Sequence, residues 1–341
     1  MSAKPEDISQ LSLVSLKIDD KTYFGSPDET ILDVSKRNNI EIPHLCFKEG
    51  MRPDGNCRVC MVEIEGERVL QPSCVRTITE GMVVNTMSDR VVHSQKLVLE
   101  LLTSDVSESV YNNDSELSHW SKKLQIQTSR FPAQIQEKHD TSHPAISVNL
   151  DACIQCTRCV RACREEQVND VIGYAHRGYK SEIVFDINDP MGDSTCVGCG
   201  ECVQACPTGA LMPSKEVGLS IPDKKVESVC PYCGVGCGLE MQPPAESGKA
   251  VRRDADGYPM WRSRGDRNHP SNLGQICIKG ATVGETLSPG RLNQPLYRDN
   301  LNDKYQSISW NEATDKIVSQ IKKSLIKKGP NSIAMYGSGQ F

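Results

Sequence analysis

Two short stretches decide the fold of this chain: CIQCTRCVRAC, from Cys153 to Cys163, and CVGCGECVQAC, from Cys196 to Cys206. Each stretch places its four cysteines at the spacing C-x2-C-x2-C-x3-C, and Pro207 follows the second. Three thiols at two-residue intervals can wrap one corner of a [4Fe–4S] cubane, for which this run is a known ligand pattern. Zinc sites usually take their ligands from two separated C-x-x-C pairs, so zinc fits this spacing poorly.

The two stretches resemble each other and indicate an internal duplication. In proteins with two such clusters, the fourth cysteine of each run ligates the other cluster. We therefore expect a first cubane held by Cys153, Cys156, Cys159 and Cys206. The second cubane would be held by Cys196, Cys199, Cys202 and Cys163. This crossing would make the two halves depend on each other for folding.

A third group of cysteines lies upstream and has a different spacing. It consists of Cys46, Cys57, Cys60 and Cys74. The pattern begins C-x10-C-x2-C, whereas plant-type ferredoxins have a shorter first gap. We predict a [2Fe–2S] cluster here, with structural zinc as the alternative, because four thiolates also suit tetrahedral zinc. The pair Asp54-Gly55 permits a tight turn whose amides could point at the sulfurs.

A fourth group lies downstream, in CPYCGVGC and in the later segment QICIKG. Its cysteines are Cys230, Cys233, Cys237 and Cys277. Zinc and a [4Fe–4S] cluster both fit this set, and we favour the cubane because glycines at 234, 236 and 238 let backbone amides approach the sulfurs. Lys279 is either an ordinary solvated lysine or a residue placed between this cluster and a cofactor.

The composition indicates several small modules and excludes some functions. The 341 residues are 38% hydrophobic and 5% aromatic, with a net charge of -5. No single large core is implied, so metal clusters would help to hold small modules together. Nucleic-acid binding lacks the positive footprint it requires. No signal peptide or long apolar segment is visible, so we expect a cytoplasmic protein without membrane insertion. In a reducing compartment, sixteen cysteines are not expected to form disulfides.

We expect an α+β protein of several modules. A [2Fe–2S] β-grasp ferredoxin would occupy residues 9–92, and a helix and connector residues 93–142. A 2[4Fe–4S] ferredoxin would occupy residues 143–215. A [4Fe–4S] domain would follow at 225–285, and the start of a truncated α/β domain at 286–341.

The local patterns give more specific expectations. In the first module, strands are predicted at 13–18 and in a hairpin at 58–64 and 68–70, with a helix after Pro27 and cysteines only in loops. A helix is predicted at 91–102, followed by a long connector at 103–142. Near the end we expect a helix at 311–327, a strand at 332–336, and a glycine-rich loop.

Together these motifs resemble the catalytic subunit of cytoplasmic, NAD-linked, molybdenum- or tungsten-dependent formate dehydrogenases, whose N-terminal part is similar to the large iron–sulfur subunit of respiratory complex I. The resemblance is carried by residues 143–178 and 194–213 and, for the first domain of molybdopterin oxidoreductases, by residues 229–280. It implies that Lys279 passes electrons between the nearest cluster and the pterin. It also implies that Ser338 and Gly339 begin a contact with molybdopterin guanine dinucleotide.

The resemblance implies a function with several components. Formate would be oxidised to CO2, and electrons would pass through one [2Fe–2S] and three [4Fe–4S] clusters to a flavin- and NAD-binding diaphorase-type subunit or a ferredoxin. The catalytic residues would lie beyond Phe341. Assimilatory-type nitrate reductase is the enzyme alternative, since residues 264–287 resemble it equally well. A multi-cluster carrier without pterin is the non-enzyme alternative.

One departure from the resembling families concerns an additional cluster. Relatives often hold a cubane with one histidine and three cysteines just after the [2Fe–2S] module. The corresponding stretch here, LLTSDVSESVYNNDSELSHW at 101–120, has no cysteine. We therefore expect this cluster to be absent and the [2Fe–2S] module to approach another cluster, or a partner protein's cluster, by a different path.

Overall fold

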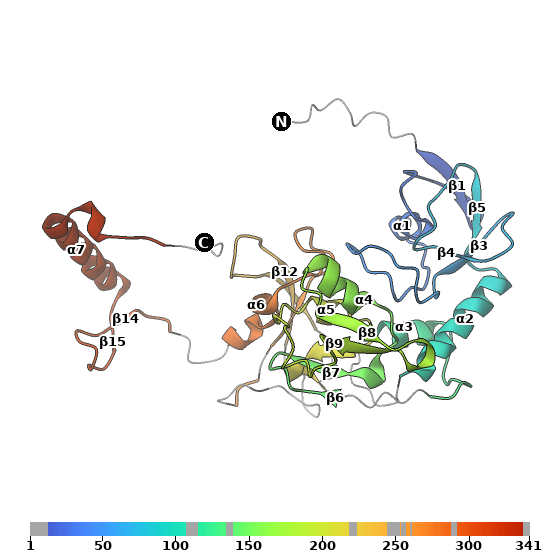
Figure 1. Cartoon of the computed structure of the whole chain (residues 1–341). Helices are drawn as coiled ribbons and strands as arrows, with labels where there is room; N and C mark the ends of the chain where they lie inside the picture. Colours follow the sequence, from blue (N-terminus) through green and yellow to red (C-terminus); the bar gives the residue numbers. More distant parts are fainter. Residues whose placement is uncertain are drawn as a thin grey trace. The chain divides into compact units, whose positions relative to one another are not determined.

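The chain folds as two compact units in a computed structural model (Figure 1). The structure describes residues 13–106, 115–133, 139–217, 224–243, 253, 257–259, 261–287 and 292–336. One unit comprises Met1–Ile221 with Ala245–Ala250, and the other comprises Pro222–Pro244 with Val251–Phe341. The boundary after Ile221 falls between the modules expected at 143–215 and 225–285.

A five-stranded mixed sheet forms the first part of the first unit. Its order is β2-β1-β5-β3-β4, in which β1 pairs parallel with β5 and antiparallel with β2. The strands are β1 (Val14–Ile18), β2 (Lys21–Gly25), β3 (Met61–Ile64), β4 (Gln71–Pro72) and β5 (Met82–Asn85). The second hairpin differs from expectation, because its outer strand is at 71–72 rather than 68–70.

Alternating side chains explain how this sheet forms its core. Leu16 and Ile18 are fully buried, whereas the intervening Lys17 is exposed. The turn residues Asp19 and Asp20 both adopt positive φ, which short polar side chains tolerate. Helix α1 (Ile31–Arg37) begins at a capping box formed by Thr30 and Asp33 and lays its apolar side on the sheet.

Two further helices follow this sheet. Helix α2 (Asp89–Ser104) contains the predicted helix and packs against β3 and α3. Helix α3 (Glu116–Lys123) lies inside the segment predicted to be a connector, so that prediction is wrong in part. The local reason is that Ser115 caps the helix and Leu117 is buried in an apolar cluster with Leu99 of α2.

The duplicated cysteine stretches fold together in the same unit. A three-stranded sheet of order β10-β7-β6 and a two-stranded β8–β9 sheet surround two short helices. The elements are β6 (His139–Asp140), β7 (Ile146–Asn149), α4 (Arg158–Arg161), β8 (Ile172–Ala175), β9 (Glu182–Phe185), α5 (Glu201–Ala205) and β10 (Leu211–Pro213). Six of the eight cysteines belong to this module's apolar core or pack against it, namely Cys153, Cys159, Cys163, Cys196, Cys202 and Cys206.

The second unit contains a three-stranded antiparallel sheet of order β11-β12-β13. Its elements are β11 (Val226–Val229), β12 (Gly238–Gln242), β13 (Arg262–Gly265), α6 (Ile278–Ala281), β14 (Leu296–Tyr297), β15 (Gln306–Ser307) and α7 (Trp310–Lys328). Helix α7 matches the predicted helix, with Ser309 at its start and Gly329 at its end. The strand predicted at 332–336 is wrong, because a 3-10 turn over Pro330–Ser332 is followed by irregular, exposed chain.

The helices also bear on the expectation about membranes. None of them within the described residues is both long enough and apolar enough to cross a membrane.

Candidate iron–sulfur centres

The first thiol group is assembled from loops beside the five-stranded sheet. Cys46 follows α1, Cys57 and Cys60 precede β3, and Cys74 follows β4, so none lies in a helix or strand. The amide of Cys46 donates to Sγ of Cys57 at 3.3 Å. The turn around Cys57 has Gly55 at φ 61° before it and Arg58 at φ 60° after it, as a tightly wound ligand loop requires.

Electrostatic coupling shows that these four thiols lie together. Hydrogen bonds from Cys57 and Cys74 lower the pKa of the Cys46 thiol, and contact with Cys74 lowers that of Cys60. The same contacts raise the pKa values of Cys57 and Cys74. The contacts among these thiols therefore favour a thiolate at Cys46 and Cys60 and disfavour one at Cys57 and Cys74.

The loops of the two duplicated stretches have the same backbone conformation. Gln155 and Gly198, each two residues after the first cysteine, have φ values of 52° and 66°. Thr157 and Gly200, four residues after it, have φ values of 66° and 85°. The amide of Gln155 donates to Sγ of Cys153, and the amide of Gly198 to Sγ of Cys196, both at 3.4 Å. Amides that point at sulfur in this way stabilise thiolates and tune cluster potentials.

The fourth cysteine of each stretch lies with the other stretch. Burial is the main cause of the raised pKa of Cys159, and the charges of Cys153, Cys156 and Cys206 raise it further. Cys202 is affected in the same way by burial and by Cys199, Cys196 and Cys163. These neighbours agree with the crossed sets, but Cys202 also acts on Cys159 and Cys206 on Cys202, so the assignment of ligands to each cubane stays a prediction.

A cavity is present where the second cubane is expected. Its cavity volume is about 10 Å³, and four of its lining residues are Cys163, Cys196, Cys199 and Cys202. The other lining residues include Ile146, Val171 and Met191, so the surroundings are largely apolar. The amide of Val171 also donates to Sγ of Cys163 at 3.3 Å. A space lined by four thiols fits an iron–sulfur cluster in its donor set.

The fourth thiol group lies in the second unit. Cys230 and Cys233 follow β11, Cys237 precedes β12, and Cys277 precedes α6. Burial raises the pKa of the Cys237 thiol, and the charges of Cys230, Cys233 and Cys277 raise it further, so these three residues lie within electrostatic reach of Cys237. Gly238 has a packing role that the sequence did not reveal, because a Cβ there would lie 2.2 Å from Cγ of His269.

The residues predicted to contact the pterin differ in what the structure shows of them. Lys279 is exposed in the first turn of α6, two residues after Cys277, and its role stays a prediction. Ser338 and Gly339 lie outside the described residues. Likewise, no group of three or more His, Cys, Asp or Glu side chains in the described ranges is arranged to hold a metal ion, so the ligand assignments also stay predictions.

The first two thiol groups are joined by a buried interface. Cys46 and Cys156 belong to one apolar cluster with Leu45, Ile154 and Leu99. Burial raises the pKa of Cys156 to about 12, and the charge of Cys46 is among the smaller causes that raise it. The [2Fe–2S] module and the module at 143–215 are therefore in direct contact, as the expected close approach of the first thiol group to another centre requires.

Two arginines at this interface were not anticipated from the sequence. Arg158 and Arg161 are 2% and 3% exposed. Arg158 donates to the Leu45 carbonyl at 2.9 Å and to both carboxylate oxygens of Glu116, at 2.7 and 3.1 Å. Arg161 donates to the Cys46 carbonyl at 2.5 Å and to the Arg52 carbonyl. The sequence did contain one signal for these two arginines, namely their positions between the cysteines of the first stretch. Charged residues at such positions must lie near the cysteines that are predicted to hold the cluster.

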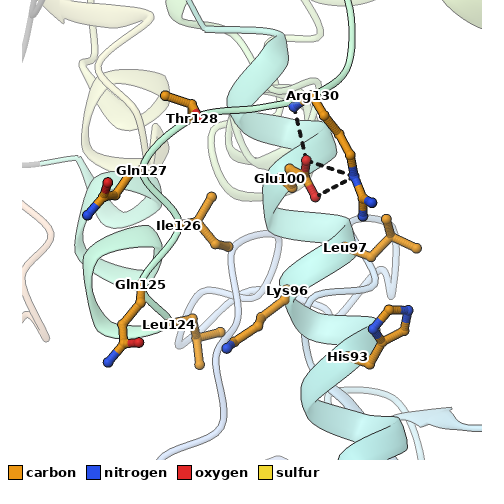
Figure 2. Close-up of a pocket in the computed structure, with 10 residues that line it drawn as sticks. All are labelled: His93, Lys96, Leu97, Glu100, Leu124, Gln125, Ile126, Gln127, Thr128 and Arg130. Atoms are coloured by element: carbon orange, nitrogen blue, oxygen red, sulfur yellow. Dashed lines mark hydrogen bonds and ion pairs between the residues drawn. The ribbon is translucent and has the colours of Figure 1, made fainter.

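A separate pocket lies between α2 and the segment at 124–130 (Figure 2). Arg130 and Glu100 form an ion pair across it, with a nitrogen–oxygen distance of 3.0 Å. None of the residues that line it is a cysteine. This pocket is therefore not one of the thiol centres.

Four family models match the chain in the order of its modules. Residues 12–89 match a 2Fe-2S iron–sulfur cluster binding domain, and residues 152–210 match a 4Fe-4S dicluster domain. Residues 223–288 match the molybdopterin oxidoreductase Fe4S4 domain, and residues 291–341 match molybdopterin oxidoreductase. The domain order deduced from the cysteines is thereby confirmed.

Curated relatives match nearly the whole chain at low identity. The "Probable oxidoreductase YjgC" of Bacillus subtilis is 27% identical over 93% of this chain. A component of the NADH-quinone oxidoreductase of Rhizobium meliloti is 29% identical over 89%. A "Putative formate dehydrogenase" of Staphylococcus aureus is 28% identical over 95%. The chain spans only 35%, 35% and 36% of the lengths of these relatives.

A solved structure also resembles this chain. It is a chain from the crystal structure of an NAD+-reducing [NiFe]-hydrogenase in the H2-reduced state, with a TM-score of 0.55 and 26% identity. The match covers 59% of this chain and 87% of that chain.

Proposed function

We propose that this chain, which carries the iron–sulfur domains and the start of the molybdopterin domain of a molybdopterin oxidoreductase, is the electron-transfer part of a formate dehydrogenase. The observation that supports this most is the order of four thiol groups, ending beside a molybdopterin oxidoreductase segment. The Staphylococcus aureus relative supports the choice of formate. Bound clusters would supply one-electron steps, and a pterin-held molybdenum or tungsten would supply the substrate chemistry.

The chain's own residues have three tasks in this proposal. Buried loops hold the thiolates and exclude water, as the raised pKa values of Cys156 and Cys202, caused mainly by burial, indicate. Amides that donate to Cys57, Cys153, Cys163 and Cys196 stabilise the thiolate charge. Lys279, beside the fourth thiol group, would connect that group to the pterin. The [2Fe–2S] end would deliver electrons to a flavin- and NAD-binding subunit or a ferredoxin.

A second candidate is the corresponding component of an NADH-quinone oxidoreductase. The Rhizobium meliloti relative favours it, with an identity slightly above that of the Staphylococcus aureus relative. Electrons in that case would enter from NADH and leave for quinone, with no substrate oxidised at a pterin. Nitrate reduction remains an enzyme alternative from the sequence.

Substrate-dependent reduction of the intact protein separates these candidates. The protein is purified anaerobically, analysed for molybdenum, tungsten and guanine dinucleotide, and mixed with formate while its visible absorption is followed. Formate dehydrogenase predicts that formate bleaches the iron–sulfur absorption in a metal-loaded protein. Reoxidation of dithionite-reduced protein by nitrate, with no response to formate, would favour nitrate reductase. Clusters without molybdenum, tungsten or nucleotide would contradict both enzymes.

A further inference from the structure

The junction of the first two thiol groups contains a buried cation for which the described part of the chain supplies no acidic partner. Arg161 is 3% exposed, and within the described residues no carboxylate forms an ion pair with it. Its guanidinium donates to the carbonyls of Cys46 and Arg52, and its Nε has no hydrogen-bond partner. A buried charge is costly unless it is paired, so the missing counter-charge calls for an explanation.

Neighbouring charged side chains are already paired elsewhere. Glu116 binds Arg158 through both carboxylate oxygens. Glu165 binds the guanidinium of Arg52 at 2.9 Å, near the protein surface. The interface therefore supplies acids to two arginines and leaves Arg161 to carbonyl oxygens, which neutralise no charge.

The position of Arg161 indicates which negatively charged group would balance the charge of its guanidinium. Its NH2 lies 2.5 Å from the carbonyl oxygen of Cys46, and its own residue lies between Cys159 and Cys163 in the chain. Four thiolates around two or four iron atoms leave a net negative charge on each centre. Arg161 thus belongs to the cubane ligand run and donates to the backbone of a [2Fe–2S] ligand residue.

We infer that Arg161 is the counter-charge and positioning residue for the [2Fe–2S] centre, which it fixes against the neighbouring cubane set and makes easier to reduce. This inference rests on the proposed function, since it requires clusters to be present. Each added electron adds negative charge, and a fixed cation in a poorly solvated interface favours the reduced form. No bond forms or breaks and no proton moves.

The rest of the interface supports the positioning role. Asn56 donates to the Gln155 carbonyl at 3.0 Å, and Thr157 donates to Asp54 at 2.7 Å. With Arg158 and Arg161, these contacts join the loop at 45–57 to the loop at 155–161. Each loop carries cysteines of one centre, so the contacts fix the two centres relative to each other.

The test uses the intact protein with three single substitutions. Arg161→Met removes the charge, Arg161→Lys keeps it with fewer donors, and Arg52→Gln removes a cation that joins the same two modules at the surface. Iron and acid-labile sulfide report cluster assembly. A redox titration followed by electron paramagnetic resonance gives the midpoint potential of the [2Fe–2S] centre.

The expected result is a charge-dependent shift. At the native midpoint, Arg161→Met should lower the ratio of reduced to oxidised [2Fe–2S] about tenfold, which is about 59 mV for one electron. Arg161→Lys should restore most of that ratio, and Arg52→Gln should leave it unchanged. An unchanged potential in fully loaded Arg161→Met, or equal shifts in the Met and Lys variants, would overturn the inference.

Two further outcomes are distinguishable from these. If the Arg161→Met protein fails to assemble the [2Fe–2S] centre, the Arg161→Gln variant is used in its place, because its amide keeps a hydrogen-bond donor without the charge. The midpoint potentials of Arg161→Gln and Arg161→Lys are then compared in the same way. If the unsubstituted protein contains no iron–sulfur cluster, the proposed function fails, and the inference fails with it.

Discussion

The two halves of the internal repeat share a backbone but differ in charge. Where the first half has Arg158 and Arg161, the second has Glu201 and Gln204 at the equivalent positions. The first half faces the [2Fe–2S] module, and its arginines bind that module's carbonyls. In the second half, burial raises the pKa of Glu201, and the nearby charge of Lys48 partly offsets this. The two halves thus keep the same loop conformation, whereas only the first carries the arginines that donate to carbonyls of the neighbouring module.

The largest effect on stability is expected from Arg158, which carries the bidentate contact. Arg158→Met should lower the free energy of unfolding by about 2–3 kcal/mol, because breaking a buried ion pair leaves a charge uncompensated and Glu116 is partly exposed. Chemical denaturation of the first unit within the intact protein measures this. Combining the change with Glu116→Gln should recover part of the loss, whereas additive losses would show that the pair is not coupled.

A substitution that strains the backbone conformation shared by the two halves of the repeat should lower the free energy of unfolding by less. Gly200→Ala introduces a Cβ at φ 85°, where the nearest other atom is 3.9 Å away, so the cost comes from backbone strain alone. We expect a loss of about 1 kcal/mol in the free energy of unfolding. Gly173→Ala is the matched control, since its φ is ordinary and its surroundings are open. Equal losses in both variants would contradict a conformational role for Gly200.

A neutral contact across the junction should matter less still. Thr157→Val removes the hydroxyl that donates to Asp54 and that has no counterpart at Gly200 in the second half. The expected loss is about 0.5–1 kcal/mol, typical of one partly exposed hydrogen bond. Thr195→Val is the control, because the Thr195 hydroxyl forms its hydrogen bond within its own module. Comparing the thermal denaturation of the two variants separates the loss of the junction contact from the general effect of removing a hydroxyl. Because Thr157 joins the two modules and Thr195 does not, Thr157→Val should shift the midpoint potential of the [2Fe–2S] centre more than Thr195→Val does.

The smallest effect is expected at the surface of the same junction. Arg52→Gln breaks an ion pair with Glu165 in which the arginine is well exposed. Exposed pairs contribute about 0–1 kcal/mol and weaken as salt screens them. We therefore expect little change in the midpoint of thermal denaturation at physiological salt. A large loss would mean that the interface depends on its rim rather than on its buried arginines.

The sequence predicted the thiol groups far better than it predicted the junction. Cysteine spacing is set by ligand geometry, which local chain length determines, so the cysteine groups and the order of the cluster domains could be anticipated, whereas the exchange of Cys163 and Cys206 between the two cubanes stays a prediction. The roles of Arg158 and Arg161 depend on carbonyls more than 100 residues away in the chain, which no local pattern encodes. Helix α3 was missed for a related reason, because its stability comes from packing against α2.

The most direct test of the central claim is elemental analysis of the anaerobically purified intact protein. The account predicts iron and acid-labile sulfide in equal amounts, matching one [2Fe–2S] and three [4Fe–4S] clusters, with little zinc. Zinc bound to the four thiol groups without acid-labile sulfide would contradict it.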